Sequence, residues 1–351
     1  MVWRASDPEG NEAGKVKYEV VAYTRGRVLD LGCGPHKAFP HFIGVDNKKD
    51  TELFGIGMRP ELVADVTNLR ESIQDESVDA IFSSHLLEHI DDWQAALASW
   101  WACIKPGGHL VLYLPHRDLY PNIGQPGANP DHKHDFVPGD IHSAMGAIAG
   151  RPGLDVLVDE VRDAGTEYSF LLVYRKRAAN AEPMPWTWPE PRTTKTACVV
   201  RYGGFGDMLQ AANVLPALKR EGFHVTVMTT PKGQDILRED PHVDAWHIQD
   251  TDQVPNDELS AFWAVQAKRF DRFINLSESV EGTLLAYPGR SNHQWPVEVR
   301  RKRLGTVNYL EFVNDLAGLP YASEARFYSS ADESTAASRF VGGMRLRAAG
   351  R

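Results

Sequence analysis

The chain has 351 residues, of which 42% are hydrophobic and 24% are charged, so its composition is that of a folded protein and not of a disordered one. At about 150 residues per domain, this length predicts two domains. The net charge of -9 argues against a nucleic-acid partner, because binding to phosphates requires clustered Lys and Arg.

The cysteines and the apolar segments indicate the cellular compartment. The three cysteines are Cys33, Cys103 and Cys198, and their wide separation does not suit a disulfide framework. The first residues lack the apolar core of a signal peptide. The longest apolar-rich stretch, residues 95–104, is too short to cross about 30 Å of hydrocarbon. We therefore expect a cytoplasmic protein without a membrane span.

A proline-rich segment separates two halves that have similar patterns. It contains Pro183, Pro185, Pro189 and Pro191 together with Trp186 and Trp188. Prolines at this density block helix formation, which predicts either a semi-rigid linker over residues 177–195 or a loop that packs its tryptophans onto a domain. In each half, strands alternate with helices, and the first strand leads into glycines and an acid.

The first half begins with four apolar runs that we assign to strands, at residues 27–31, 41–46, 78–83 and 109–114. A helix follows the third strand, with Asp91 as its expected N-cap. Its apolar residues recur at helical spacing and predict a buried face: Trp93, Leu97, Trp100, Trp101 and Ile104. Residues 154–161 and 167–174 then predict a hairpin. This order predicts an α/β fold with a mostly parallel sheet and one antiparallel edge.

A glycine pair and three acids follow the predicted strands, at the edge where ligands bind in such sheets. The glycines lie in Gly32-Cys33-Gly34, and the acids are Asp30, Asp46 and Asp65. Lys37 stands where the dinucleotide fingerprint has its third glycine, which argues against a pyrophosphate site. Carboxylates suit a ligand with a ribose diol, an amine and an adenine amino group, because each of these donates hydrogen bonds.

These residues are part of a series of motifs that resembles the class I S-adenosylmethionine-dependent methyltransferases of the type 11 group. In chain order the motifs are residues 28–35 (VLDLGCGP), 44–46 (GVD), 64–66 (ADV), 84–89 (SHLLEH) and 105–108 (KPGG). The resemblance implies a Rossmann-like methyltransferase domain over residues 20–176, preceded by an N-terminal extension at residues 1–19. It also implies S-adenosylmethionine as the cofactor.

The resemblance assigns the cofactor-binding residues one by one. They are Asp30, Gly32, Cys33, Gly34, Asp46, Asp65, Val66, Ser83 and Ser84. The two glycines would face the methionine part, and Asp46 would bind the ribose hydroxyls. Asp65 would frame the adenine with Val66, and the two serines would line the methyl-donor pocket. Asp30 would order the glycine loop or reach the amino group through water; alone, Asp30 or Asp65 would equally suit a cap or turn.

One segment departs from the family pattern. Twelve positions separate Gly34 from Asp46, where the family usually has a full helix. Residues 36–40 can form no more than a turn, because Pro40 ends any helix there. The shortened segment resembles a subset of the family. It affects how far the protein encloses the methionine end of the cofactor.

The acceptor is constrained mainly by motifs that the chain lacks. Residues 83–86 (SSHL) differ from the proline-containing signatures of DNA methyltransferases, which disfavours base flipping. Glu88 stands alone, unlike the paired glutamates of protein arginine methyltransferases. We therefore expect a small molecule or a sugar as the acceptor.

Histidines are the candidates for a general base that deprotonates the acceptor. His85 and His89 are four positions apart and would share a face if their segment were helical; hydrogen bonding within the turn is the alternative. His132 and His134 follow a glycine- and proline-rich loop, where acceptor pockets often form in this fold. With His142 they could also bind a divalent metal, or they could belong to a solvated loop. We take His132, His134 and His85 as catalytic candidates and assign no metal ligand.

The second half repeats the alternation of strands and helices. Strands are predicted at residues 197–201, 224–228, 244–248 and 271–276, and one helix carries Leu209, Val214, Leu215 and Leu218. The predicted domain, residues 196–325, resembles the N-terminal Rossmann-like domain of GT-B glycosyltransferases of the heptosyltransferase family. The resemblance depends on Arg201, Gly206-Asp207 and residues 215–219 (LPALK). It implies that Asp207 is a general base; an acid there would also suit a helix N-terminus.

The glycosyltransferase resemblance is incomplete. GT-B enzymes bind the nucleotide sugar with a second Rossmann-like domain, and only about thirty residues follow Pro320, most of them in a predicted tail at residues 326–351. The donor half would be truncated or supplied by a partner. Methyl transfer to a small molecule or sugar, for example in surface glycan biosynthesis, is therefore our first interpretation. Glycosyl transfer and non-catalytic glycan binding or scaffolding are the alternatives.

Overall fold

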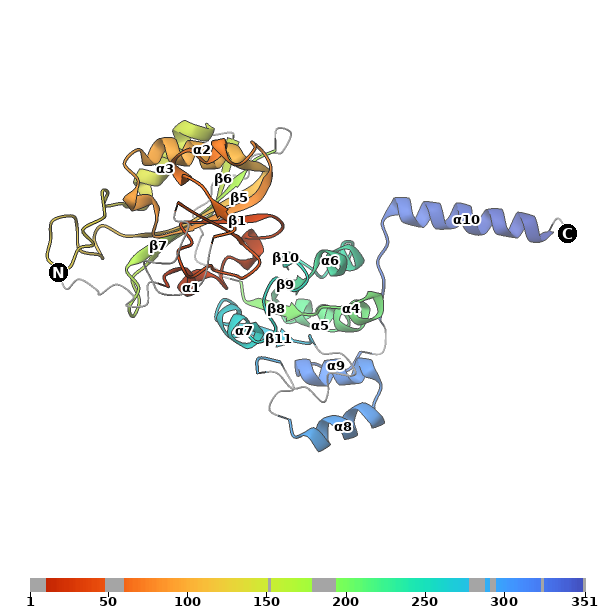
Figure 1. Ribbon diagram of the computed structural model, residues 1–351. Helices are drawn as coiled ribbons and strands as arrows, with labels where there is room; N and C mark the ends of the chain where they lie inside the picture. Colours follow the sequence, from red (N-terminus) through yellow and green to blue (C-terminus); the bar gives the residue numbers. More distant parts are fainter. Residues whose placement is uncertain are drawn as a thin grey trace. The chain divides into compact units, whose positions relative to one another are not determined.

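The computed structural model (Figure 1) describes residues 11–47, 60–150, 153–178, 194–277, 288–290, 295–322 and 325–349. The chain divides into two compact units, Met1–Glu190 and Pro191–Arg351, so the boundary falls in the proline-rich segment. Residues 179–193 of that segment, including both tryptophans, lie outside the described residues. Among the described residues, no helix combines the length and apolar character needed to span a bilayer.

The first unit is built on a seven-stranded sheet. Its strands are, in order across the sheet, β3 (Leu62–Val63), β2 (Ile43–Asp46), β1 (Val28–Leu31), β4 (Val78–Ser84), β5 (Ile104–Pro115), β7 (Ser169–Lys176) and β6 (Leu154–Arg162). The strands from β3 to β5 are parallel, and β7 runs antiparallel to both of its neighbours. This order confirms the expected α/β sheet with an antiparallel hairpin at its edge.

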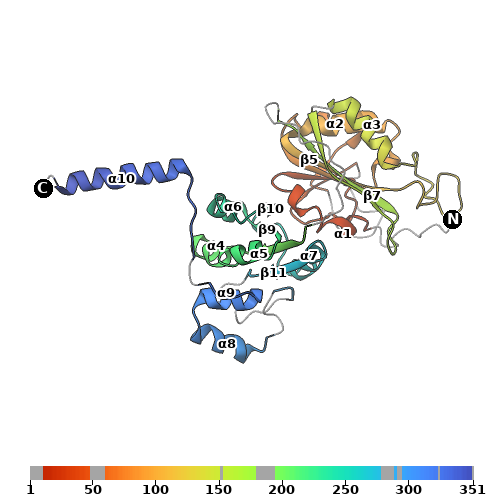
Figure 2. The same cartoon turned by 180° about the vertical axis from the view of Figure 1, so that it is seen from behind.

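Helices cover both faces of this sheet. α2 (Trp93–Cys103) and α3 (Pro138–Ala149) lie on one face, and α1 (Ala13–Val16) lies on the other (Figures 1 and 2). Leu97, Trp100 and Trp101 of α2 are buried in the core between these helices and the sheet, as their spacing predicts. The indole N–H of Trp100 donates a hydrogen bond to the Val66 carbonyl at 2.7 Å, so this large side chain is fully satisfied.

The N-cap of α2 differs from the expectation. The helix begins after Asp92, whose carboxylate accepts a hydrogen bond from the Ala95 N–H at 3.2 Å. Asp91 is exposed and pairs with Lys133 instead. The expected cap was therefore wrong by one residue, because two adjacent acids both satisfy the sequence preference and only the backbone direction selects between them.

Residues 11–24, most of which we had placed in an extension, pack against the sheet. They form α1 and the 3-10 helix η1 (Val21–Tyr23). Val16, Val20 and Val21 are completely buried, and α1 lies on the face opposite α2 and α3 (Figures 1 and 2). Arg162 of β6 donates two hydrogen bonds of 2.8 Å to the Glu19 carboxylate. The N-terminal segment therefore belongs to the first unit.

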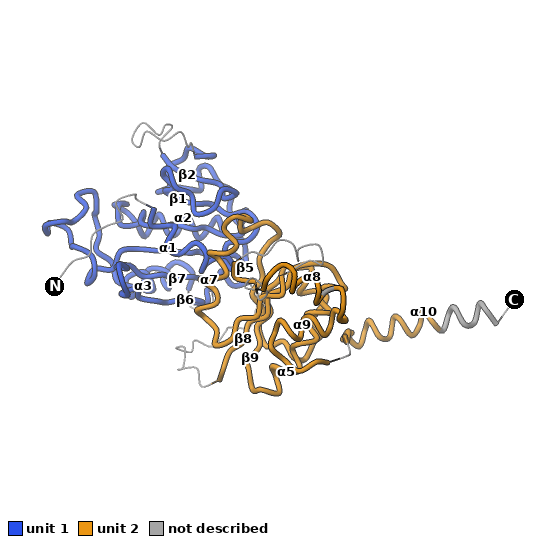
Figure 3. Tube along the Cα trace, turned by 90° about the horizontal axis from the view of Figure 1, so that it is seen from below, with its two compact units in different colours: residues 1–190 blue, residues 191–351 orange. Residues whose placement is uncertain are grey.

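The second unit (orange in Figure 3) has a four-stranded parallel sheet in the order β10 (Ala245–Ile248), β9 (His224–Thr229), β8 (Thr196–Val200) and β11 (Arg272–Asn275). Its helices are α4 (Phe205–Ala212), α5 (Leu215–Arg220), α6 (Pro231–Leu237), α7 (Leu259–Ala267), α8 (Val297–Thr306), α9 (Tyr309–Ala317) and α10 (Ala331–Ala349). The four strands lie where the sequence predicts them.

Two elements of the second unit differ from the expectation. The single helix expected after β8 is two helices, because Pro216 occupies the first turn of α5, where a proline starts a helix. The expected tail at residues 326–351 contains α10. Ser330 and Glu333 form a capping box before this helix: the Glu333 N–H donates to the Ser330 hydroxyl, and the Ser330 N–H donates to the Glu333 carboxylate.

Candidate active site

The glycine loop after β1 lies at the carboxyl edge of the first sheet. Gly32 and Gly34 have φ of 67° and 49°, a backbone region that residues other than glycine rarely adopt. A Cβ added to Gly34 would meet no atom within 4 Å, so this stretch of backbone is open to a ligand. A Cβ on Gly32 would lie 2.7 Å from the Leu86 side chain. The glycine loop therefore borders the loop that follows β4.

Two of the strand-end acids hold this glycine loop in place. Asp30 is buried, and its carboxylate accepts a hydrogen bond from the Ala38 N–H at 2.8 Å. Burial raises the pKa of Asp30 to about 7. Asp46, at the end of β2, accepts a hydrogen bond from the Gly34 N–H at 3.1 Å. Asp46 thus holds the glycine loop itself, and Asp30 holds the segment that follows it.

The short segment between Gly34 and β2 forms only turns, as predicted, and Lys37 fixes it. The Lys37 ammonium donates to the carbonyls of Pro40 and Phe42 at 2.8 and 3.0 Å and pairs with Glu61 at 2.5 Å. Glu61 also accepts a hydrogen bond from the Gly44 N–H of β2. These contacts of Lys37 occupy the position where the family usually has a helix, and the sequence does not predict them.

The remaining proposed cofactor residues differ in their contacts. Asp65 is exposed and caps the 3-10 helix η3 (Val66–Glu71), where it accepts hydrogen bonds from the Thr67 N–H and hydroxyl at 2.8 and 2.7 Å. The Cys33 thiol packs against Gly44, and burial raises its pKa to about 12. The hydroxyls of Ser83 and Ser84 are buried and, among the described residues, have no hydrogen-bond partner. A ligand or water must satisfy such groups.

A second group of polar side chains lies beyond the end of β4 and consists of Glu88, His85, His89 and His132, which we call the Glu88 cluster. Glu88 is completely buried. Its Oε1 is 3.8 Å from His85 Nδ1, 3.9 Å from His89 Nε2 and 3.8 Å from His132 Nε2. These distances are too long for hydrogen bonds. Among the described residues, neither oxygen of Glu88 has a hydrogen-bond partner.

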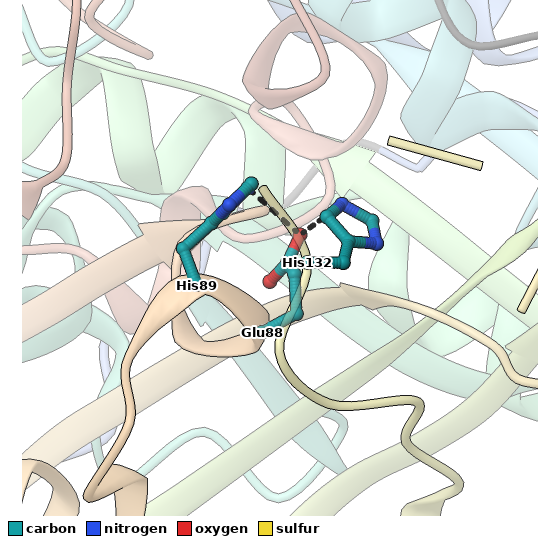
Figure 4. Close-up of side chains that lie close together, drawn as sticks. All are labelled: Glu88, His89 and His132. Atoms are coloured by element: carbon teal, nitrogen blue, oxygen red, sulfur yellow. Dashed lines mark ion pairs between the residues drawn. The ribbon is translucent and has the colours of Figure 1, made fainter. Parts of the chain in front are cut away.

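Two loops build the Glu88 cluster. Glu88 and His89 belong to the 3-10 helix η4 (Leu87–His89), and Leu87 anchors this turn in the core. His132 comes from the loop after β5, and the N–H groups of Lys133 and His134 donate to the Glu88 carbonyl at 2.8 and 3.2 Å. Figure 4 shows the Glu88 carboxylate between the imidazoles of His89 and His132. The backbone hydrogen bonds therefore bring His132 to the side chain of Glu88.

His85 and His89 do not share a helix face, contrary to the conditional expectation. His85 has φ of 49°, in the left-handed region, so a helix cannot run through it. Its Nε2 forms a 2.9 Å hydrogen bond with the Ser169 hydroxyl, whereas His89 Nδ1 bonds to the Asp131 carbonyl. The two imidazoles therefore approach Glu88 from different surroundings. A residue other than glycine in the left-handed backbone region, as His85 is, often lies at a functional site.

Burial keeps the Glu88 cluster uncharged near neutral pH. It raises the pKa of Glu88 to about 8, and the nearby Glu12 adds to this effect. It also lowers the pKa of His85 to about 3 and that of His132 to about 4. The imidazoles are therefore neutral and retain a lone pair for a proton, a hydrogen bond or a metal ion.

The grouping of His132, His134 and His142, which the sequence left open as an alternative, does not form. His134 Nε2 donates to the Ile90 carbonyl at 2.9 Å, and its ring lines a groove of about 610 Å³ together with residues of α2 and α3. None of the proposed cofactor residues lines this groove. His142 is bonded to Asp159 at 3.0 Å and to the Tyr174 hydroxyl at 2.8 Å. Only His132 of the three joins Glu88.

Glu88 and Glu12 belong to the site although neither is a site residue predicted from the sequence. Glu88 carried a signal, because it is a single acid that follows the apolar pair Leu86-Leu87 and precedes His89. Glu12 carried none: it lies in the N-terminal segment, and its carboxylate comes within 3.8 Å of His85 Nε2 while accepting a hydrogen bond from the Tyr168 hydroxyl. Only the packing of α1 places it there.

In the second unit, the structure brings Arg201 and Asp207 together. One oxygen of Asp207 accepts a hydrogen bond from the Gly204 N–H at 2.9 Å, which caps α4. The other oxygen pairs with Arg201 at 2.5 Å. Arg201 is buried and also donates to the Leu276 carbonyl at 2.6 Å. Asp207 therefore both caps a helix and neutralises a buried guanidinium.

The comparison with protein families decides the assignment. A family model described as a methyltransferase domain matches residues 17–213, more than half of the chain. The chain belongs to this methyltransferase family. The methyltransferase uses S-adenosylmethionine as its cofactor. The residues at the strand ends have the chemistry to bind this molecule. The backbone at Gly34 is open to a ligand, Asp46 has a carboxylate, and the hydroxyls of Ser83 and Ser84 have no hydrogen-bond partner among the described residues.

Solved structures resemble the methyltransferase at low sequence identity. S-adenosylmethionine-dependent methyltransferases from Archaeoglobus fulgidus and Mesorhizobium loti are 19% and 18% identical, with TM-scores of 0.34 and 0.37; the matches cover 47% and 48% of this chain and 94% and 100% of theirs. A 1,6-didemethyltoxoflavin-N1-methyltransferase from Burkholderia thailandensis is 16% identical, with a TM-score of 0.36 and coverage of 48% and 80%. No curated protein matches the chain significantly.

Proposed function

We propose that this methyltransferase acts on a hydroxyl or amine of a small polar acceptor, such as a sugar, which binds at the Glu88 cluster. The observation that carries the proposal is the completely buried Glu88 carboxyl group, which lies within 3.9 Å of nitrogen atoms of three imidazoles. Among the described residues, neither of its oxygens has a hydrogen-bond partner. Leaving such a group unsatisfied costs about 1–3 kcal/mol, so a polar group from outside the chain is favoured there.

The proposed acceptor site borders the proposed cofactor site. Leu86 packs against Gly32, and it belongs to the same loop as His85 and Glu88. Gly32, Gly34 and Asp46 would hold the cofactor with the hydroxyls of Ser83 and Ser84. When bound, the cofactor supplies an electrophilic sulfonium methyl group.

The chain's own residues would act mainly by positioning the acceptor. Holding two reacting groups in line provides the larger part of the rate in such displacements, and proton removal adds a smaller part. The neutral imidazoles of His85 and His132 can each accept a hydrogen bond from an acceptor hydroxyl or amine and so orient it; their lowered pKa values do not suit full proton removal. His134 uses its Nε2 to hold the Ile90 carbonyl, so we give it a structural role.

We further propose that Asp207 is a structural residue and not the base of a glycosyltransferase. A general base needs a carboxylate oxygen that faces the acceptor hydroxyl. Both oxygens of Asp207 already have partners within its own unit, the Gly204 N–H and the Arg201 guanidinium. These contacts explain the Asp207 motif without sugar transfer.

A transfer assay tests the proposed function. The purified chain would be incubated with methyl-labelled S-adenosylmethionine and a panel of monosaccharides, oligosaccharides and small hydroxylated or amino compounds, and the products would be identified by mass spectrometry. We expect label on one class of these acceptors. Glu88→Gln should lose most of the turnover and keep its cofactor affinity, whereas Asp75→Ala, an exposed control, should retain both. No label on any compound of the panel, from a chain that binds the cofactor, would contradict the proposal.

A further inference from the structure

We propose that Glu88, His89 and His132 form a binding site for a first-row divalent metal ion, best matched by Zn²⁺, and that an oxygen or nitrogen of the acceptor completes the coordination. The second part rests on the proposed function, whereas the metal site does not. The inference assigns a ligand to three residues that no part of the cofactor site explains.

The geometry of the three side chains carries the inference. One potential ligand atom of each residue lies within 4.8 Å of those of the other two. Glu88 Oε1 lies 3.9 Å from His89 Nε2 and 3.8 Å from His132 Nε2, with the carboxylate between the two rings (Figure 4). Zinc bonds of about 2.0–2.1 Å to nitrogen and oxygen place tetrahedral ligand atoms roughly 3.3 Å apart. The observed separations are longer than this, so the three side chains would have to move slightly closer together when the ion binds.

An outer hydrogen bond orients one of the proposed ligands. His89 Nδ1 lies 3.1 Å from the Asp131 carbonyl, which can only accept, so the proton must be on Nδ1. The lone pair is then on Nε2, the atom that lies near Glu88. Metal-binding histidines commonly use their second nitrogen in this way, and such partners set the tautomer and ring direction.

The burial of Glu88 is the second, independent observation. The carboxyl group is completely buried, and its Oε1 and Oε2 have no hydrogen-bond partner among the described residues. The histidine nitrogens are too distant to hydrogen-bond to it. A cation that displaces the Glu88 proton and is held jointly by the carboxylate and the two imidazoles would satisfy all three side chains, because each then donates a lone pair to it.

The donor set indicates the class of metal. Two imidazoles and one carboxylate suit Zn²⁺ and its first-row neighbours, whereas Mg²⁺ and Ca²⁺ prefer oxygen ligands. Three protein ligands leave at least one position open, which is typical of catalytic sites and not of structural ones. That position suits the acceptor hydroxyl or amine. His85, bonded to Ser169, stays outside the ligand set on this arrangement.

Direct metal binding tests the site without any acceptor. The full chain would be treated with EDTA, dialysed, and titrated with Zn²⁺ by calorimetry and with Co²⁺ by visible absorption. We expect one ion per chain and no comparable binding of Mg²⁺. Glu88→Gln, His89→Ala and His132→Ala should each weaken Zn²⁺ binding by about 100-fold or more, since loss of an outer partner alone costs 10–100-fold. His224→Ala, an exposed histidine of the second unit, should bind as the wild type does.

The outcomes separate the metal site from the proposed function. Circular dichroism would verify that each variant is folded; the half-exposed His89 is the substitution least able to disturb the core. Wild-type protein that binds no Zn²⁺, or folded variants that bind it as His224→Ala does, would overturn the metal site whatever the transfer assay shows. Zn²⁺ binding that requires Glu88, His89 and His132, without methyl transfer to any small acceptor, would support the site and contradict the proposed function. Equal acceptor affinity with and without Zn²⁺ would overturn the coordination of the acceptor.

Discussion

Replacement of Asp46 by Ala tests the cofactor site most directly. Asp46 ends β2, and its carboxylate accepts a hydrogen bond from the Gly34 N–H at 3.1 Å. On our proposal it also accepts hydrogen bonds from the ribose hydroxyls of the cofactor. Asp46→Ala therefore removes a direct contact with the ligand and, in addition, a contact that holds the glycine loop in its ligand-ready position.

The expected magnitude follows from the number and the surroundings of these contacts. A hydrogen bond to a charged group contributes about 1.5–3 kcal/mol. Asp46 is only half-buried, so solvent reduces this contribution, and we expect a total loss of about 1–3 kcal/mol. Since about 1.4 kcal/mol is tenfold in affinity, the Kd for the cofactor should rise by roughly 5- to 150-fold. Asp46→Asn retains an acceptor for the Gly34 N–H and should give an intermediate value.

Calorimetric titration with S-adenosylmethionine or its demethylated product measures the effect without an acceptor. Asp75→Ala is the matched control, because Asp75 is exposed and pairs with Arg70 on the surface. It removes the same charge from the chain and should leave the Kd unchanged. Equal affinity of the wild type and Asp46→Ala would refute the role of Asp46. An equal loss in Asp75→Ala would show that net charge, and not the contact, is responsible.

Three further predictions concern stability. Burial raises the pKa of Asp30 from an ordinary value of 3.8 to about 7. The folded state therefore binds this proton more tightly than the unfolded state does. The resulting stabilisation of the folded state is complete below about pH 4 and is lost as the pH rises through 7. Urea unfolding of Asp30→Asn should therefore lose less stability between pH 4.5 and 7.5 than the wild type does; parallel curves would contradict this. Asp92→Ala should lower the free energy of unfolding by about 1 kcal/mol through loss of the α2 cap, and Asp91→Ala should change it little; the reverse order would make Asp91 the cap. Asp207→Asn should cost about 1–2 kcal/mol, because the buried Arg201 loses its charged partner at a half-exposed position, and methyl transfer should not change. Sugar transfer by the wild type that is abolished in Asp207→Asn would overturn the structural role of Asp207.

The strands and the cofactor edge were open to prediction because their signals are local. Strand runs such as residues 28–31 and 78–84 are short, apolar and followed by glycine or a polar turn, and both formed as expected. In a parallel sheet the carboxyl ends of neighbouring strands share one edge, so the positions of Asp30 and Asp46 followed from the order of the motifs. Where two solutions fit a local rule equally well, as for Asp91 and Asp92 at the start of α2, the sequence did not choose between them.

The Glu88 cluster was decided only by the tertiary structure. His132 belongs to a different loop from Glu88, and it arrives there because two N–H groups of its loop donate to the Glu88 carbonyl. One alternative from the sequence grouped His132 with His134 and His142, but the structure turns His134 toward the Ile90 carbonyl and His142 toward Asp159. Side-chain spacing within one element follows from its period, but contacts between loops depend on how the chain closes and on which groups burial leaves unsatisfied. For this reason the cofactor edge could be predicted from the sequence, and the polar site beside it could not.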